Sequence, residues 1–145
     1  MADSDDVLKL ENQLCFPFYA VSRLITRHYQ PLLEKLNLTY PQYLVLLVLW
    51  ERQSSSVTEL SRILLLNSNT LTPLLKRLEA QGYIQRTRSC EDERRVMISL
   101  TERGWNLRKE ALGIPEKLVA SLEYSEEDLI ALKKLIDPFL EALKK

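Results

Sequence analysis

A cysteine and a tyrosine stand four residues apart near the start of the chain, at Cys15 and Tyr19. Helical spacing places two such residues on one face, one turn apart. A cysteine thiolate attacks peroxides, and a nearby phenol O–H can donate a hydrogen bond that stabilises the sulfur anion. The pair is therefore a candidate redox switch, with Cys15 as its reactive residue.

The remaining composition argues against several other kinds of chemistry. With two cysteines and one histidine, neither a disulfide framework nor a zinc-type Cys/His set is expected. There is no Gly-rich phosphate loop and no Ser/His/Asp order, and His28 lies far from Cys15 on helical spacing. We expect no enzyme activity, no metal and no cofactor. No signal peptide or bilayer-spanning apolar run is evident, so we expect a cytoplasmic protein without a membrane partner.

Length and charge are typical of one mainly helical domain with a local basic region. At 145 residues, 46% of them hydrophobic and only three of them glycine, the sequence favours a single ordered domain over residues 1–145. Twenty basic and twenty acidic side chains cancel, a balance that by itself argues against nucleic acid binding. Residues 60–104, however, carry eight Lys/Arg against five Asp/Glu, so positive charge is concentrated there.

Residues 7–28 carry the periodicity of a long helix, with side chains of one face recurring at three- and four-residue steps. Pro17 interrupts this pattern, because proline lacks an N–H and disfavours helical geometry at the residue before it. The helix is therefore either kinked beside Cys15 or begins there. The upstream periodicity favours the kink, and in both cases we expect an irregular backbone around the sulfur.

A capping box marks the start of the most hydrophobic helix. Thr39 is followed three residues later by Gln42, so each side chain can bond the other's backbone N–H, and a helix is predicted to begin at Tyr40. The residues from there to Glu51 are almost all apolar, as expected for a helix buried on most sides. We expect this helix to lie at the centre of the core.

Two shorter helices are predicted next. Ser56 and Glu59 form a second capping box, for a helix that ends near residue 64 or 65. A polar turn then leads to a helix over about residues 69–81, whose leucines share one face and which Gly82 stops.

After this point the apolar period changes from helical to alternating. Residues 83–88 and 95–100 alternate on either side of a charged turn, which predicts a β-hairpin with a basic tip. Thr101 caps a predicted helix that runs to about Leu122, and Ser125 begins a last amphipathic helix.

A short helix, a tight turn, a second helix and a basic hairpin have the order of a winged helix-turn-helix. The predicted fold is mainly α with a small β-hairpin wing: residues 53–103 form the winged helix, and residues 7–36 and 104–145 form dimerisation helices. The second helix of such a unit fits the DNA major groove, and a basic hairpin reaches the backbone or the minor groove. The candidate DNA-binding residues are Ser68, Asn69, Thr70, Thr72, Lys76, Arg77, Arg86, Arg88, Asp92, Arg94 and Arg95.

The segment Asp92-Glu93-Arg94-Arg95, with residues 96–104 after it, resembles the wing and following helix cap of the MarR family of transcriptional repressors. Residues 69–82 are similar to the recognition helix of that family. The resemblance covers nearly the whole chain and implies a homodimer on a pseudo-palindromic operator in double-stranded DNA. It also implies that Arg94 enters the minor groove and that Asp92 orients it.

Residues 10–16, together with Tyr19, are similar to the organic-hydroperoxide-sensing, OhrR-like branch of that family. The resemblance implies oxidation of Cys15 to a sulfenic acid, with Tyr19, Tyr29 and Tyr40 hydrogen-bonding the sulfur. Tyr29 lies fourteen residues after Cys15, which is about 21 Å along a helix, so it can reach only the cysteine of a second copy. The predicted function is a repressor that releases its operator when an organic hydroperoxide oxidises Cys15.

Other interpretations remain open. A repressor of this family could respond to a small phenolic or other ligand in the dimer cleft, with Cys15 a bystander. A thiol peroxidase would show steady peroxide turnover, and a helical interaction protein with a degenerate DNA module would show no salt-dependent DNA binding. Cys90 stands in the wing among acidic residues, which disfavour a thiolate, so we interpret it as an incidental surface thiol and Cys15 as a one-cysteine sensor.

Overall fold

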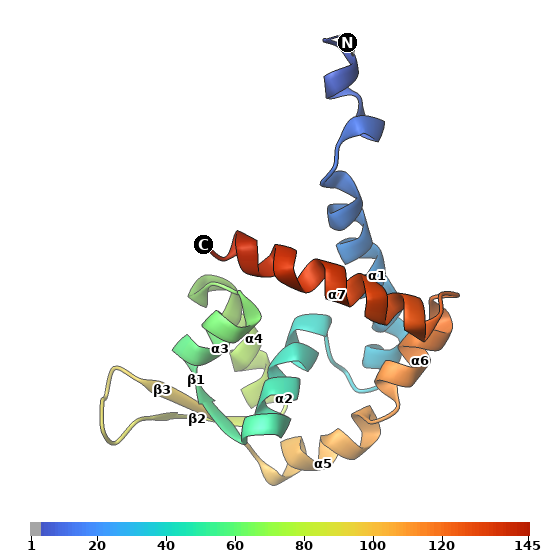
Figure 1. The fold of residues 1–145 in the computed structure, drawn as a ribbon. Helices are drawn as coiled ribbons and strands as arrows, with labels where there is room; N and C mark the ends of the chain where they lie inside the picture. Colours follow the sequence, from blue (N-terminus) through green and yellow to red (C-terminus); the bar gives the residue numbers. More distant parts are fainter. Residues whose placement is uncertain (1–3) are drawn as a thin grey trace.

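The computed structural model describes residues 4–145, and Figure 1 shows the order and arrangement of their helices and strands. An arm with two 3-10 turns, Asp6–Leu8 and Leu10–Asn12, precedes α1 (Phe16–Glu34), α2 (Tyr40–Arg52), β1 (Ser54–Ser56), α3 (Val57–Leu64) and α4 (Ser68–Ala80). The hairpin strands β2 (Ile84–Arg88) and β3 (Val96–Leu100) are followed by α5 (Glu102–Ala111), α6 (Ile114–Ser121) and α7 (Glu126–Leu143). This order confirms a mainly helical fold with a small wing.

The helix α1 begins at Phe16, with Cys15 as its N-cap, so the expected kinked helix from residue 7 is wrong and the alternative, a helix that begins beside Cys15, is correct. Proline is tolerated there because the N–H groups of a first helical turn have no partner within the helix. The upstream apolar residues belong to the 3-10 turns of the arm, which projects away from the body of the molecule (Figure 1).

The helix α2 forms the centre of the core, as its apolar run predicts. Its capping box is present: Thr39 N donates to Gln42 Oε1 at 2.9 Å, and Gln42 N donates to Thr39 Oγ1 at 3.4 Å. Trp50, near its other end, donates from Nε1 to the carbonyl of Gly104 at 2.9 Å and so ties α2 to α5. The buried apolar residues of α2 are Tyr43, Val45, Leu46, Val48, Leu49 and Trp50.

The hairpin belongs to a three-stranded antiparallel sheet with the order β1-β3-β2. In the hairpin, Ile84 is opposite Leu100 and Arg88 is opposite Val96. The strand β1 adds a pairing that the sequence did not predict, because its three serines show no apolar alternation. Its pairing with β3 joins the wing to the start of α3.

The helices α3 and α4 form the helix-turn-helix. Ser56 Oγ accepts from Glu59 N at 3.1 Å and caps α3, which ends at Leu64 as predicted. Leu65 takes a left-handed conformation with φ of 55°, which turns the chain toward α4. Asn67 then caps α4 by accepting from Thr70 N at 2.9 Å.

The predicted single helix from residue 102 to about Leu122 is wrong, because the chain breaks between α5 and α6 around Leu112 and Gly113. Pro115 accounts for the break: it has no N–H to continue α5, but it fits the first turn of α6. The following helix α7 begins where predicted, since Ser125 Oγ accepts from Asp128 N at 3.0 Å.

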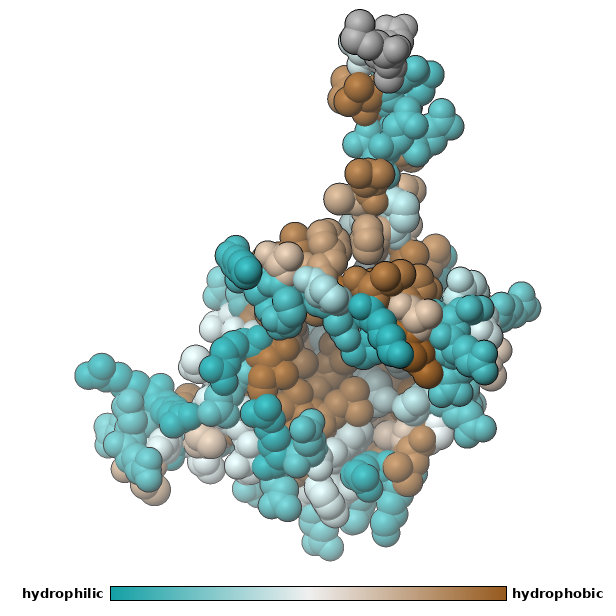
Figure 2. All heavy atoms as spheres, viewed as in Figure 1, coloured by the Kyte–Doolittle hydropathy of each residue, from teal (hydrophilic) through white to brown (hydrophobic). Residues whose placement is uncertain are grey.

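The arm, α1 and α7 expose apolar side chains that no other part of the described chain covers. Figure 2 shows apolar residues along the arm and around the region where α1 and α7 approach each other. Phe18 and Phe139 join these two helices with ring centroids 5.4 Å apart. The exposed apolar residues of these segments include Val7, Leu8, Leu10, Leu14, Phe16, Val21, Leu24, Ile130, Leu135, Ile136, Leu140 and Leu143.

Candidate DNA-binding surface and redox site

The helix α4 has one buried face and one free face. Its leucines 71, 74, 75 and 78 are buried in the core, which fixes the rotation of the helix. The opposite side presents hydroxyl, amide and basic groups of the kinds that contact base edges and phosphates. The candidates Ser68, Asn69, Thr70, Lys76 and Arg77 are exposed, and Thr72 is half-buried.

The wing loop is held by two hydrogen bonds that Asp92 accepts, one through its side chain and one through its backbone carbonyl. Asp92 Oδ1 accepts from Arg94 N at 3.0 Å, and the Asp92 carbonyl accepts from Arg95 N at 2.9 Å. Asp92 therefore shapes the backbone that carries Arg94. Within residues 4–145 the structure gives the Arg94 guanidinium no hydrogen bond or ion pair, and this side chain is exposed.

Arg95, in contrast, forms an ion pair with a carboxylate of its own chain. Its Nη2 lies 3.1 Å from Glu59 Oε1, and Ser55 Oγ donates to Glu59 Oε2 at 3.1 Å. The hydrogen bond from Ser55 is the main reason that the pKa of Glu59 lies below its usual range, and Arg95 lowers it further. Sequence reasoning missed this link, since Glu59 and Arg95 are far apart in the chain. Arg62 lines a surface groove together with Glu59 and Arg95.

The other basic candidates lie along the hairpin. Arg88 is exposed and donates from Nη1 to the Glu93 carbonyl at 3.3 Å, across the wing loop. Arg86 is half-buried, and its backbone N–H donates to Glu79 Oε2 of α4 at 3.2 Å. The hairpin is thus attached to α4 as well as to α3.

Cys15 is an exposed free thiol at the N-terminus of α1. Its carbonyl accepts from Phe18 N at 3.1 Å and from Tyr19 N at 3.4 Å, so Tyr19 follows one turn later. Tyr19 is 61% exposed, and the Arg23 guanidinium lies 5.3 Å from its ring centroid.

Tyr29 and Tyr40 lie together at the other end of α1. Their ring centroids are 4.5 Å apart, and Tyr43 lies 5.9 Å from Tyr29. Burial raises the pKa of Tyr29 well above its usual value, and the phenols of Tyr40 and Tyr43 raise it further. Burial also raises the pKa of Tyr40 and of Tyr43. All three phenols therefore keep their protons and can donate hydrogen bonds. Tyr43 was missed, although its position three residues after Tyr40 places it on the same helical face.

A single chain does not bring Cys15 to Tyr29 and Tyr40. Because α1 is continuous from Phe16 to Glu34, fourteen residues separate the cysteine from Tyr29 by about 21 Å. Only Tyr19 is near Cys15 within one chain.

The other cysteine, Cys90, is an exposed free thiol in the wing loop. No group of three or more His, Cys, Asp or Glu residues within residues 4–145 is arranged to hold a metal ion. Over the same residues, no helix is both long and apolar enough to cross a membrane.

A helix-turn-helix followed by a hairpin wing defines the class of winged-helix transcription regulators. The family model for the transcriptional regulator SarA/Rot matches residues 27–111. The chain is also 52% identical over 143 residues to the organic hydroperoxide resistance transcriptional regulator of Bacillus subtilis (strain 168), covering 99% of this chain and 97% of that protein. The chain therefore belongs to the MarR family of transcriptional regulators, in its OhrR-like branch.

Solved structures of AbfR from Staphylococcus epidermidis share this fold in several redox states. Reduced AbfR bound to DNA is 37% identical, with a TM-score of 0.82 over 98% of this chain and 97% of that chain. Overoxidised AbfR bound to DNA has a TM-score of 0.76 at 38% identity, over 97% and 99% of the two chains. The disulfide form has a TM-score of 0.62 at 37% identity, over 97% and 93%. The chain is thus a DNA-binding transcriptional regulator, and its relatives include a regulator solved on DNA in both a reduced and an overoxidised state.

Proposed function

We propose that this regulator is a repressor that leaves its operator when an organic hydroperoxide oxidises Cys15. The observation that carries the proposal is an exposed thiol at the N-terminus of α1, in a chain 52% identical to an organic hydroperoxide resistance regulator. The fold is also similar to that of reduced AbfR bound to DNA, with a TM-score of 0.82, which supports the DNA-binding part of the proposal.

The sensor site is proposed to be completed by a second copy of the chain. Two α1 helices that cross antiparallel would bring Cys15 of one copy to Tyr29 and Tyr40 of the other. The exposed apolar faces of the arm, α1 and α7 provide surface for this association, because they would otherwise remain in contact with water. The pair of neutral phenols at Tyr29 and Tyr40 would then donate hydrogen bonds to the thiolate.

The chemistry is a stoichiometric oxidation. The Cys15 thiolate attacks the terminal oxygen of the hydroperoxide, an S–O bond forms and the O–O bond breaks. The alkoxide that leaves takes a proton from water, giving an alcohol and a cysteine sulfenic acid. Phe16 and Phe18, which follow Cys15 in the chain and are both exposed, would bury the alkyl part of an organic peroxide. The neutral sulfenic acid no longer attracts phenol donors as the thiolate does, so the dimer shifts and its recognition helices lose their spacing on DNA.

The proposed DNA contacts follow from which side chains are free. Two copies of α4 would enter successive major grooves of a pseudo-palindromic operator. Arg94, carried by a backbone that Asp92 holds, would enter the minor groove. The remaining proposed contacts are Ser68, Asn69, Thr70, Thr72, Lys76, Arg77, Arg86 and Arg88, whereas Arg95 at the base of the wing is paired with Glu59 and is not among them.

The test joins oxidation to DNA release in one sample. Reduced protein bound to a duplex that it has enriched from a random pool is treated with one equivalent of cumene hydroperoxide. Mass spectrometry of Cys15 and Cys90 is run beside the DNA-binding measurement. We expect oxygen to be added at Cys15 and the DNA to be released. The Cys15→Ser variant should bind the duplex with unchanged affinity and stay bound, with Cys90→Ser as the matched control that still releases. Release of Cys15→Ser by the peroxide would show that the sensor is elsewhere.

A pocket favours a second candidate function, control by a small phenolic ligand. A pocket of about 380 Å³ between α2 and the α5–α6 break is lined by Tyr43, Leu47, Trp50 and Leu112, with Arg108 at its edge. The walls are mostly apolar, Glu51 also lines the pocket, and Arg108 is the group that would pair with the carboxylate of an aromatic acid. If salicylate releases the DNA from Cys15→Ser and from the wild type alike, this second function is supported.

A further inference from the structure

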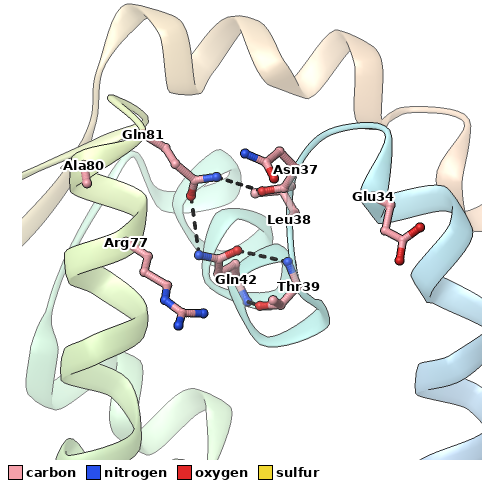
Figure 3. A pocket seen from close by; sticks show the side chains of 8 residues that line it. All are labelled: Glu34, Asn37, Leu38, Thr39, Gln42, Arg77, Ala80 and Gln81. Atoms are coloured by element: carbon pink, nitrogen blue, oxygen red, sulfur yellow. Dashed lines mark hydrogen bonds between the residues drawn. The ribbon is translucent and has the colours of Figure 1, made fainter.

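The side-chain amides of Gln42 and Gln81 and the backbone carbonyl of Asn37 link the start of α2 to the end of α4. Gln81, the C-cap of α4, donates from Nε2 to the Asn37 carbonyl at 2.7 Å. Its Oε1 accepts from Gln42 Nε2 at 3.4 Å, while Gln42 Oε1 accepts from Thr39 N at 2.9 Å. Figure 3 shows Gln81 reaching from the end of α4 to both partners. We call Asn37, Gln42 and Gln81 the amide bridge.

The amide bridge lies beside the tyrosine pair of the proposed sensor. Tyr40 is the first residue of α2 and stands between Asn37 and Gln42 in the chain. Its ring stacks on Tyr29 of α1. A shift of Tyr40 relative to α1 would therefore act on the two partners of Gln81, which are the Asn37 carbonyl and the Gln42 side chain, because these residues stand on either side of Tyr40 in the chain.

The bridge is also built so that it can open. Gln42 is only 4% exposed, so its side-chain amide has little access to water and depends on protein partners. The bond that joins α2 to α4 is the longest of the three, at 3.4 Å, and is the weakest link. A groove of about 370 Å³, lined by Glu34, Arg77 and the bridge residues, lies open alongside and leaves room for displacement (Figure 3).

We infer that Gln42 and Gln81 are positioning residues that carry the redox signal from the Tyr29–Tyr40 pair to the recognition helix. This inference rests on the proposed function, since it assigns the path by which oxidation of Cys15 alters DNA binding. In the reduced dimer the bridge holds the C-terminal end of α4 against the α1–α2 turn. Oxidation displaces Tyr40, the Gln42–Gln81 bond opens, and α4 leaves its DNA-competent orientation.

Two substitutions cut the bridge at different bonds. Gln42→Glu keeps the capping box, because a glutamate carboxylate also accepts from the N-cap N–H, but it has no N–H to donate to Gln81. Gln81→Glu keeps an acceptor for Gln42 but cannot donate to the Asn37 carbonyl. Gln53→Glu is the matched control: it adds the same charge at an exposed glutamine for which the structure gives no side-chain hydrogen bond within residues 4–145.

The measurement is the ratio of the Kd for the enriched duplex after one equivalent of cumene hydroperoxide to the Kd before it. Both bridge variants should lower this ratio at least about fivefold relative to wild type, because a neutral hydrogen bond supplies at least about twofold and the proposed dimer loses one in each copy. Gln53→Glu should leave it unchanged. Hydrogen exchange of residues 77–83 gives a second readout that needs no DNA: oxidation should speed exchange there in wild type and not in the bridge variants.

The outcomes separate the inference from the proposed function. A wild-type ratio near one refutes the proposed function, and the inference with it. A large wild-type ratio that both bridge variants retain, with the same rise in exchange at residues 77–83, refutes the inference alone. Where a reduced bridge variant binds DNA too weakly for the ratio of Kd values to be measured, hydrogen exchange at residues 77–83 decides whether the inference holds.

Discussion

The two neighbouring wing arginines, Arg94 and Arg95, are expected to respond differently to mutation. The Arg94 guanidinium has no hydrogen bond or ion pair within residues 4–145, so Arg94→Ala should remove one DNA-contacting cation from each wing of the proposed dimer. A specific arginine contact contributes about 1–3 kcal/mol, so the loss of two should weaken binding at least about thirtyfold. Each cation also releases counterions, so the slope of log Kobs against log salt should become shallower by about 0.9 per wing.

Arg95 is already neutralised by Glu59 at 3.1 Å, and both partners are partly exposed. Arg95→Ala should therefore change the affinity by less than about threefold and leave the salt slope unaltered. Glu59→Gln leaves Arg95 without its partner at the base of the wing, so it should bind DNA no more weakly than wild type, and the double variant should stay within about threefold of wild type.

The assay is fluorescence anisotropy of labelled duplex titrated with reduced protein at several salt concentrations. Thermal denaturation of each variant at matched concentration checks that the fold is retained. The reasoning is refuted if Arg95→Ala lowers the salt slope as much as Arg94→Ala does, since Arg95 would then contact phosphate. It is equally refuted if Glu59→Gln weakens binding, since removal of the Glu59 charge leaves Arg95 unpaired beside the DNA.

Three further predictions concern the phenols, the glycines and the second thiol. Because burial raises the folded-state pKa of Tyr29, its contribution to stability is complete below the usual tyrosine value of about 10 and is lost as pH rises above it. The melting temperature should thus fall above pH ~10, and less steeply in Tyr29→Phe; equal slopes would contradict this. A Cβ at Gly104 would collide with the Tyr83 carbonyl, so Gly104→Ala should cost about 2 kcal/mol or more in urea denaturation. Gly113→Ala, whose Cβ would meet only Lys117 Cε at 3.8 Å, should cost little. Iodoacetamide should alkylate Cys90 in the native protein, because its thiol is exposed, and resistance to alkylation would contradict this.

Elements whose signals are local could be predicted from sequence. The capping box at Thr39, the stop at Leu64 and the Ser125 cap all formed where predicted, because each depends on residues within one turn of one another. The buried leucine face of α4 was predictable for the same reason: helical periodicity puts those side chains together whatever the rest of the chain does.

The errors arose where local signals competed. Apolar spacing upstream of Pro17 suggested a kinked helix, but those residues form 3-10 turns whose apolar side chains are exposed rather than packed on a helical face. Thr101 correctly marked the start of α5, yet Pro115 outweighed the helical pattern and divided the segment in two. The strand β1 could not be predicted from sequence, because three serines acquire strand geometry only by pairing with β3.

By itself the sequence determined which chemical groups are present and which local elements carry them: a thiol at Cys15, tyrosines fourteen residues on and beyond, and a basic wing. Only the tertiary structure decided which groups meet. It placed Tyr43 beside Tyr29, bound Arg95 to Glu59 and left Arg94 free, and joined Gln81 to Gln42. These contacts join residues distant in the chain. Their partners are set by how helices pack around α2, and no spacing along the sequence encodes that packing.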